Sequence, residues 1–153
     1  MRTKTTMMVE SIRNGTVLDH IPSDKLFAIV SLLRLEQFTA PVTIGNNLES
    51  KQIGSKGIIK MSDRFFTEAE LSRIAIIAPR VRLNVIRDFE VVEKKVLTPP
   101  SEVLALVRCP NAKCITSNEP MATRFAVSGS ADRLVLECHY CGRKTNGDKV
   151  ELL

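Results

Sequence analysis

The chain has 153 residues, of which 44% are hydrophobic and 25% charged, a composition typical of soluble globular proteins. No apolar stretch approaches the roughly 20 residues that a membrane-spanning helix needs, and residues 1–10 lack the apolar core of a signal peptide. The net charge of +5 favours anionic partners, and we expect a cytoplasmic protein that does not associate with membranes.

Two consecutive prolines mark the clearest break in the chain. Pro99 and Pro100 exclude a helix and cannot donate to a central sheet ladder. All four cysteines follow this break. We therefore expect one domain over residues 1–97, a hinge over 98–101 and a smaller domain over 102–153.

Two helices are predicted before the break. The first follows Ser23, a candidate N-cap, and its apolar stripe consists of Leu26, Phe27, Ile29, Val30 and Leu33. The second opens with the capping-box pattern of residues 67–70 and ends at Pro79.

Strands are predicted over residues 15–21, 41–48, 56–61, 81–86 and 89–96. The turn-forming pair Asn46-Asn47 ends the second strand, and Arg87-Asp88 forms a two-residue hairpin turn between the last two. The order β-α-β-β-α-β with one added strand predicts an α+β fold of ferredoxin-like type, an α/β sandwich with both helices on one face of the sheet.

The other face of this sheet needs an explanation. With Arg87-Asp88 as the turn, Ile86 pairs with Phe89 and Asn84 pairs with Val91, so these four side chains share one face. Such a face is a second core, a surface covered by a partner, or a flat site for a planar ring.

The four cysteines are spaced as in a zinc ribbon. Cys109-x4-Cys114 is followed after 23 residues by Cys138-x2-Cys141. Disulfides are disfavoured in a cytosolic chain, and four thiolates leave no open position on zinc for catalysis. We expect one structural zinc ion in a small all-β domain, with His139 on its surface.

No nucleophile, base and orienting group occur at compatible spacing. Asp19 and His20 are adjacent, but neighbouring strand residues point to opposite faces, so a polar pair is the simpler interpretation than a catalytic one. Lysines at the edge of a sheet face bind phosphates as point charges, and the candidates are Lys56 and Lys60 on one strand and Lys94 and Lys95 on another, unless they are merely exposed.

Several segments together resemble the regulatory chain of aspartate carbamoyltransferase. They are residues 15–22 (GTVLDHIP), 43–48 (TIGNNL), Ala78-Pro79, residues 81–92 with Asn84, Cys109-Pro110-Asn111 through Cys114-Ile115, Glu119-Pro120 and the closing Cys138-x2-Cys141. The similarity extends from about Val9 to the C-terminus. It implies a noncatalytic chain that binds ATP and CTP, often together with UTP, and that docks through its zinc domain on catalytic chains of pyrimidine synthesis. The typical assembly joins two catalytic trimers through three regulatory homodimers.

The resemblance also implies site residues. Val9, Glu10 and Ile12 would lie near the base, Asp19 and Lys60 near the ribose, and His20, Lys56 and Lys94 near the phosphates, with Asn84, Ile86, Phe89 and Val91 as the wall beside the nucleotide. Phe89 stands where family members often carry tyrosine.

The same resemblance places three residues, Asn111, Lys113 and Glu119, on the surface that faces the catalytic chain. The alternative function is that of a zinc-ribbon regulatory protein that binds nucleic acid. Residues 101–153 hold seven Lys/Arg and six Asp/Glu, a net +1, and few aromatic residues, so we expect no nucleic-acid partner.

Overall fold

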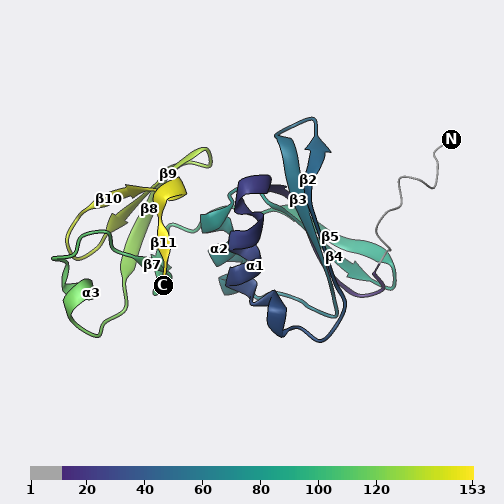
Figure 1. The fold of residues 1–153 in the computed structure, drawn as a ribbon, viewed down its shortest axis with the longest axis horizontal. Coiled ribbons are helices and arrows are strands. Elements are labelled where there is room, and N and C mark those ends of the chain that lie inside the picture. The colour runs from purple at the N-terminus through teal and green to yellow at the C-terminus, as the bar shows by residue number, and fades with distance from the viewer. Residues whose placement is uncertain (1–11) are drawn as a thin grey trace. The chain divides into compact units, whose positions relative to one another are not determined.

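The computed structural model describes residues 12–153. They form two compact units, which Figure 1 shows with their elements labelled. Unit 1 comprises the described residues up to Thr67 together with Arg80–Val96, and unit 2 comprises Glu68–Pro79 together with Leu97–Leu153. Among the described residues, no helix has the length and apolar character needed to cross a membrane.

Within the described residues of unit 1, five antiparallel strands form one sheet in the spatial order β2-β3-β1-β4-β5. The strands are β1 (Gly15–Pro22), β2 (Val42–Ser50), β3 (Gly54–Ser62), β4 (Arg82–Arg87) and β5 (Glu90–Val96). The first four follow the order of a βαββαβ chain, and β5 adds to the edge as the hairpin partner of β4. The predicted α+β class is confirmed.

Helix α1 (Leu26–Leu33) follows a single 3₁₀ turn, η2 (Ser23–Lys25), and is followed by a second, η3 (Leu35–Gln37). Because η2 precedes the helix, the N-cap position falls on Lys25, and the prediction of Ser23 as the cap is wrong. The predicted apolar stripe is confirmed at Leu26 and Ile29, which are fully buried. Phe27 lies on a different side of the helix and is 65% exposed.

Side chains alternate strictly across the middle of the sheet. On β3, Ile59 and Met61 are buried, and they pair with the buried Leu18 and Thr16 of β1. Helix α1 covers this face, because a Cβ built on Gly57 of β3 would lie 2.7 Å from Cδ1 of Leu26. The intervening residues therefore point to the opposite face.

The hairpin between β4 and β5 differs from the prediction by one residue. Arg87 pairs with Glu90, so the two turn residues are Asp88 and Phe89, which both have positive φ (50° and 68°). Positive φ at both central residues matches a type I′ turn, whose twist suits a two-residue hairpin. Phe89 consequently lies in the turn and does not pair with Ile86.

The register after this turn also differs. Ile86 pairs with Val91, and a bulge then brings Asn84 opposite Lys94 rather than Val91. A second difference occurs in β2, where Asn46 and Asn47 do not end the strand. They form a bulge between Gly45 and Leu48, with Asn47 at φ 59°, and the strand continues to Ser50.

Unit 2 contains two small antiparallel sheets in its described residues, ordered β10-β9-β8-β6 and β11-β7. Their strands are β6 (Glu102–Leu104), β7 (Val107–Arg108), β8 (Arg124–Ser130), β9 (Arg133–Cys138), β10 (Lys144–Asn146) and β11 (Glu151–Leu152). The helices of this unit are α2 (Glu68–Ile77), the single turn α3 (Ile115–Asn118) and the 3₁₀ turn η4 (Gly147–Lys149). Phe125 and Leu136 are fully buried at the centre of the larger sheet.

Candidate functional sites

One cross-strand row runs over the sheet face opposite α1. Lys60 of β3 pairs with Val17 of β1, Val17 pairs with Asn84 of β4, and Asn84 pairs with Lys94 of β5. We call the surface defined by these four residues the lysine face. Three of its members, Lys60, Asn84 and Lys94, are residues that the sequence predicts for one site, and the antiparallel register brings them side by side.

The two lysines of this row have no carboxylate within ion-pairing distance among residues 12–153. Lys94 is exposed and Lys60 is half-buried. Two uncompensated ammonium groups on one face create a positive potential, which favours an anionic ligand.

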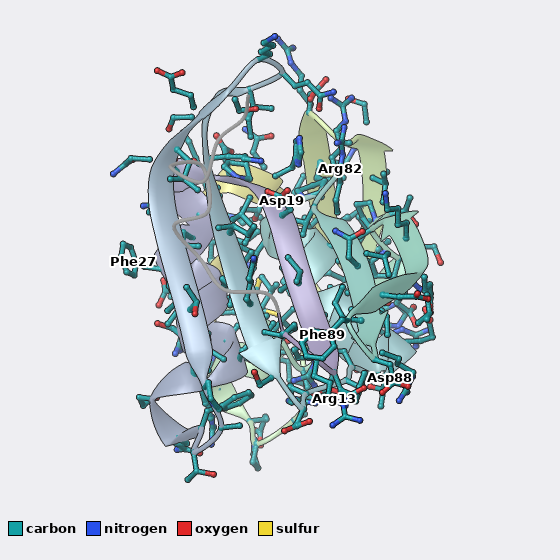
Figure 2. The ribbon with its side chains drawn as sticks, turned by 90° about the vertical axis from the view of Figure 1, so that its right-hand side faces the viewer. Arg13, Asp19, Phe27, Arg82, Asp88 and Phe89 are labelled. Carbon is teal, nitrogen blue, oxygen red and sulfur yellow. The ribbon has the colours of Figure 1, made fainter. Side chains whose placement is uncertain are left out.

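A second group lies beside the lysine face, two residues further along β1 and two residues back along β4. Asp19 pairs with Arg82 across β1 and β4, and Figure 2 shows both at the same end of the sheet. The carboxylate of Asp19 lies 3.0 Å from Nζ of Lys56 and accepts a 2.7 Å hydrogen bond from the backbone N–H of His20. We call Asp19, His20, Lys56 and Arg82 the Asp19 cluster.

The polar Asp19–His20 pair that the sequence favours is present, but the premise that the two side chains point to opposite faces is wrong. The pairing of β1 with β3 shifts between Leu18 and Ile21, and His20 has φ 59°. This bulge interrupts the alternation of side chains, so Nδ1 of His20 lies 3.5 Å from Oδ2 of Asp19. Two consecutive residues therefore serve one cluster.

Burial lowers the pKa of His20 below its usual value, and the positive charges of Arg82 and Lys56 lower it further, against the raising effect of Asp19. The buried Nδ1 also lacks a hydrogen-bond partner among the described residues. His20 is therefore neutral at pH 7 in the free chain, with a ring nitrogen that an additional ligand could satisfy.

The opposite end of the lysine face is apolar. Ile86 is buried and pairs with the exposed Val91, while Phe89 in the adjoining turn is 64% exposed. The backbone N–H of Phe89 donates to the carbonyl of Arg13 at 2.9 Å, and the residue before Arg13 in the chain is the half-buried Ile12. Figure 2 shows Phe89 beside Arg13 and Asp88, at the end away from Asp19.

Two predicted residues of this site, Val9 and Glu10, lie outside the described residues. Sequence reasoning also missed one member of the site, Arg82. Its place in the Asp19 cluster depends on the pairing of β1 with β4, which joins segments more than 60 residues apart. The local sequence around residue 82 does not indicate this pairing.

The four cysteines come together in unit 2. Their sulfur atoms all lie within 4.8 Å of one another, with Cys109 and Cys141 at 3.6 Å and Cys114 and Cys138 at 3.7 Å. All four are free thiols. A tetrahedron of sulfurs about 2.3 Å from a central ion has edges of about 3.8 Å, so donor type and spacing both fit a tetrahedral metal ion.

Two short turns aim these thiols inward. In the first, the backbone N–H of Cys114 donates to the carbonyl of Asn111 at 2.9 Å. In the second, Gly142 adopts φ 76° and donates to the carbonyl of Cys138 at 2.9 Å. His139 is exposed and stands apart from the sulfur cluster.

The thiols of this cluster differ in pKa. Burial raises the pKa of the Cys109 thiol to about 12, whereas a hydrogen bond with the backbone of Arg143 lowers the pKa of the Cys141 thiol to about 6. A metal that binds all four sulfurs must displace protons, so its binding weakens as the pH falls.

The three predicted interface residues surround the first cysteine turn. The side chain of Asn111 already makes a hydrogen bond within the turn, because its Oδ1 accepts from the backbone N–H of Lys113 at 3.0 Å. Lys113 and Glu119 are both exposed. Sequence reasoning did not single out the exposed apolar residues of this region, which are Ile115, Met121 and Tyr140.

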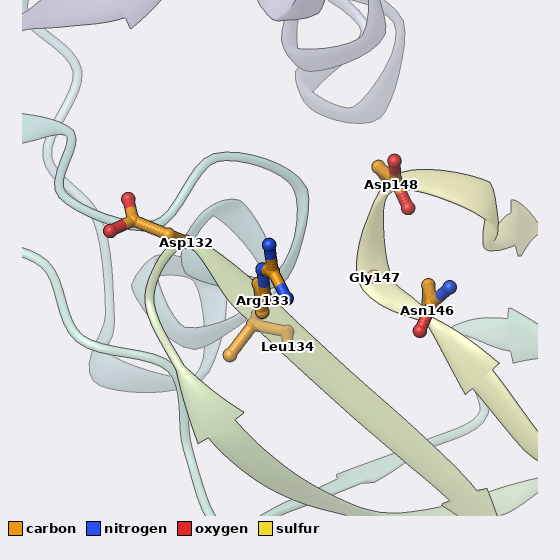
Figure 3. Close-up of a pocket in the computed structure, with 6 residues that line it drawn as sticks. All are labelled: Asp132, Arg133, Leu134, Asn146, Gly147 and Asp148. Atoms are coloured by element: carbon orange, nitrogen blue, oxygen red, sulfur yellow. The ribbon is translucent and has the colours of Figure 1, made fainter.

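Unit 2 also contains an open hollow of about 370 Å³ between the start of β9 and η4. Figure 3 shows that the carboxylates of Asp132 and Asp148 do not converge on the central Arg133. No predicted site residue lines this hollow. We assign it no role.

Comparisons with known proteins agree over the whole chain. Family models described as "Aspartate carbamoyltransferase regulatory chain, allosteric domain" and "Aspartate carbamoyltransferase regulatory chain, metal binding domain" match residues 7–98 and 101–151. A regulatory chain of this enzyme from Porphyromonas gingivalis is 57% identical over 150 residues, which cover 98% of this chain and 99% of the relative. Regulatory chains from Phocaeicola vulgatus (52% identical, 98% and 96% covered) and Staphylothermus marinus (40% identical, 95% and 90% covered) are also similar.

Proposed function

This chain belongs to the aspartate carbamoyltransferase regulatory chain family, and from that membership we propose that it binds ATP and CTP, with UTP as an additional effector, on the lysine face. As a regulatory chain it is the noncatalytic subunit of the enzyme. The single observation that carries the nucleotide proposal is the row of Lys60, Asn84 and Lys94 across the sheet, with the Asp19 cluster on one side of it along the strands and apolar residues on the other.

The two ends of the lysine face suit the two ends of a nucleotide. Ile86 lies four residues from Arg82 along β4, or about 13 Å at about 3.3 Å per residue. We assign the base to the apolar end, near Ile86, Val91 and Phe89, and the phosphates to the end with His20 and Lys56. Asp19 then offers a carboxylate that accepts hydrogen bonds from ribose hydroxyls, and the amide of Asn84 lies between the two ends.

We assign zinc to the four-cysteine site. Zinc has no redox chemistry and favours four thiolates in a tetrahedron, and the sulfur spacings of 3.6 and 3.7 Å fit such a shell. The ion would have a structural role, because a shell closed by Cys109, Cys114, Cys138 and Cys141 leaves no position for a substrate. The four free thiols support a cytoplasmic location, where thiols stay reduced.

The surface around the first cysteine turn is the part that we propose docks on a catalytic chain. It combines exposed charged residues, Lys113 and Glu119, with exposed apolar residues, Ile115 and Met121. An apolar centre with a polar rim is the usual composition of a protein interface. The metal holds this turn in place, so assembly would depend on zinc.

A second copy of the chain would pair along β2. This strand forms an edge of the sheet, and its Ile44 and Leu48 are 41% and 40% exposed. An exposed edge that carries apolar side chains is a template for pairing with another chain. A regulatory homodimer would cover this edge.

The regulatory effect would be a coupling free energy between the nucleotide site and a distant catalytic site, of about 1–3 kcal/mol in typical cases. ATP and CTP can shift the enzyme only through their different affinities for its quaternary states. The division into a nucleotide-binding part over residues 1–97 and a docking part over 102–153 belongs to this proposal.

One experiment tests the whole proposal. The full-length chain is mixed with the catalytic trimer of the same organism, and aspartate saturation is followed with and without ATP and CTP. We expect a complex whose saturation curve responds to the nucleotides. A chain that forms no such complex, and instead binds DNA in a salt-sensitive manner, would support the nucleic-acid alternative.

A further inference from the structure

Arg82 has only one recorded side-chain partner in the described part of the chain. Its guanidinium donates to Oε1 of Gln52 at 2.7 Å. A guanidinium carries five N–H donors, and a neutral amide oxygen is a weaker partner for it than a phosphate. Most of the hydrogen-bonding capacity of Arg82 is therefore available for a ligand.

Gln52 lies at the tip of the hairpin between β2 and β3. Ser50 pairs with Gly54, so Lys51, Gln52 and Ile53 form a three-residue turn, and all three are exposed. Within the turn, Oγ of Ser50 accepts long hydrogen bonds of 3.3 Å from the backbone N–H groups of Gln52 and Ile53. The Gln52–Arg82 bond therefore ties an exposed turn to the sheet end that carries the Asp19 cluster.

The electrostatics at this end favour an anion. The side chain of Arg82 belongs to the same face as Asn84, two residues further along β4, and Asp19 lies opposite Arg82 on β1. The carboxylate of Asp19 is already engaged by Lys56. The charges of Lys56 and Arg82 both lower the pKa of His20, which places them around the same space.

We propose that Arg82 is a further nucleotide contact that Gln52 holds in the free chain, and that it transfers to the phosphate chain of a bound nucleoside triphosphate. The transfer breaks the Gln52–Arg82 bond and releases the turn at residues 51–53. This inference rests on the proposed nucleotide site. The released turn directly follows β2, the strand that we propose pairs with a second copy of the chain. Nucleotide binding would therefore reach the homodimer edge.

The first test compares CTP with CMP by titration calorimetry on the full-length chain. Arg82→Gln should weaken CTP binding by about tenfold or more, because a hydrogen bond to a charged group is worth at least one decade of affinity. CMP, whose single phosphate lies nearer the ribose, should lose less. The control is Arg34→Gln, which removes the same charge from the exposed end of α1 and should leave both affinities unchanged.

The second test separates a ligand contact from a structural link. If Gln52 only competes for Arg82, Gln52→Ala should retain CTP affinity or increase it slightly. If the link merely supports the fold, Gln52→Ala should weaken CTP binding as much as Arg82→Gln does, and the proposal would be wrong. Amide hydrogen exchange at residues 51–53 should accelerate when CTP binds to the wild-type chain, and unchanged or slower exchange would contradict the release step.

The outcomes also distinguish this inference from the function on which it rests. A wild-type chain that binds neither CTP nor ATP would overturn the nucleotide site as a whole. A wild-type chain that binds CTP, with Arg82→Gln binding it equally well, would overturn only the role of Arg82.

Discussion

Asn84 of β4 and Lys94 of β5 are directly paired across the edge of the sheet, although a bulge separates their register from that of the adjoining hairpin turn. The pairing places an amide and an ammonium group next to each other on the lysine face. The next residue in the chain, Lys95, pairs with the buried Leu83 and points to the other face of the sheet.

Lys94→Ala should therefore weaken the binding of ATP and CTP by about tenfold, since an ion-assisted contact to a phosphate is lost. Lys95→Ala removes the same charge from the adjacent position and is the matched control. Calorimetric titration of both variants measures the effect. Equal losses in the two variants would show that only the overall charge of the strand matters and that the site lies elsewhere.

Nucleotide binding should take up a proton at His20. Its pKa lies below the usual value in the free chain, because of burial and the nearby cations, and an arriving phosphate would raise it. A ligand that raises a pKa binds more tightly as the pH falls toward that pKa, so the affinity advantage of the wild-type chain over His20→Gln should grow between about pH 8 and about pH 6. Titrations in buffers of different ionisation enthalpy count the proton. Identical pH profiles for the two proteins would contradict the prediction.

Removal of the metal should unfold residues 101–153, which contain all four cysteines. Structural zinc in small domains contributes roughly 10–16 kcal/mol of apparent binding energy that is coupled to folding. Chelation, or Cys114→Ala, should therefore abolish docking on the catalytic chain while nucleotide binding persists. Circular dichroism and limited proteolysis monitor the folded state. His139→Ala is the control, and it should keep one zinc ion per chain because this exposed ring lies outside the sulfur cluster.

Gly15→Ala should destabilise the sheet more than Gly54→Ala does. Both glycines have positive φ, 147° and 84°, but a Cβ on Gly15 would lie 2.1 Å from the carbonyl oxygen of Met61, whereas a Cβ on Gly54 meets nothing within 4 Å. We expect the free energy of unfolding to fall by about 1 kcal/mol at Gly54, from backbone strain alone, and by about 3 kcal/mol or more at Gly15, where the clash is added. Denaturant unfolding of both variants compares the costs, and equal costs would show that the β1–β3 pair adjusts to the extra carbon.

The sequence of strands and helices along the chain and the cysteine cluster could be predicted because each depends on a strong local pattern. The apolar periodicity of single elements and the two short cysteine spacings are both visible in the sequence. The hairpin turn could not be placed correctly, because Phe89 is an unusual residue for the left-handed backbone of a type I′ turn, which asparagine and glycine normally occupy. A shift of one residue then changed the predicted partner of Asn84.

Two other differences between prediction and structure have separate physical origins. The turn preference of asparagine predicts a strand end at Asn46 and Asn47, but its tolerance of the left-handed region serves equally well for a bulge inside a strand. The membership of Arg82 in the site depends on long-range register. Sequence patterns record the periodicity of single elements, and they do not record which residues of two distant strands meet.

The bulge in β1 has a consequence for protein engineering. Because the chain kinks at His20, Asp19 and His20 face the same cluster from consecutive positions, which a regular strand does not allow. A designer who transplants this anion site to another antiparallel sheet must therefore copy the backbone of residues 18–21 together with the side chains. On a regular strand, the same two residues would be divided between the two faces, and one of them would enter the core.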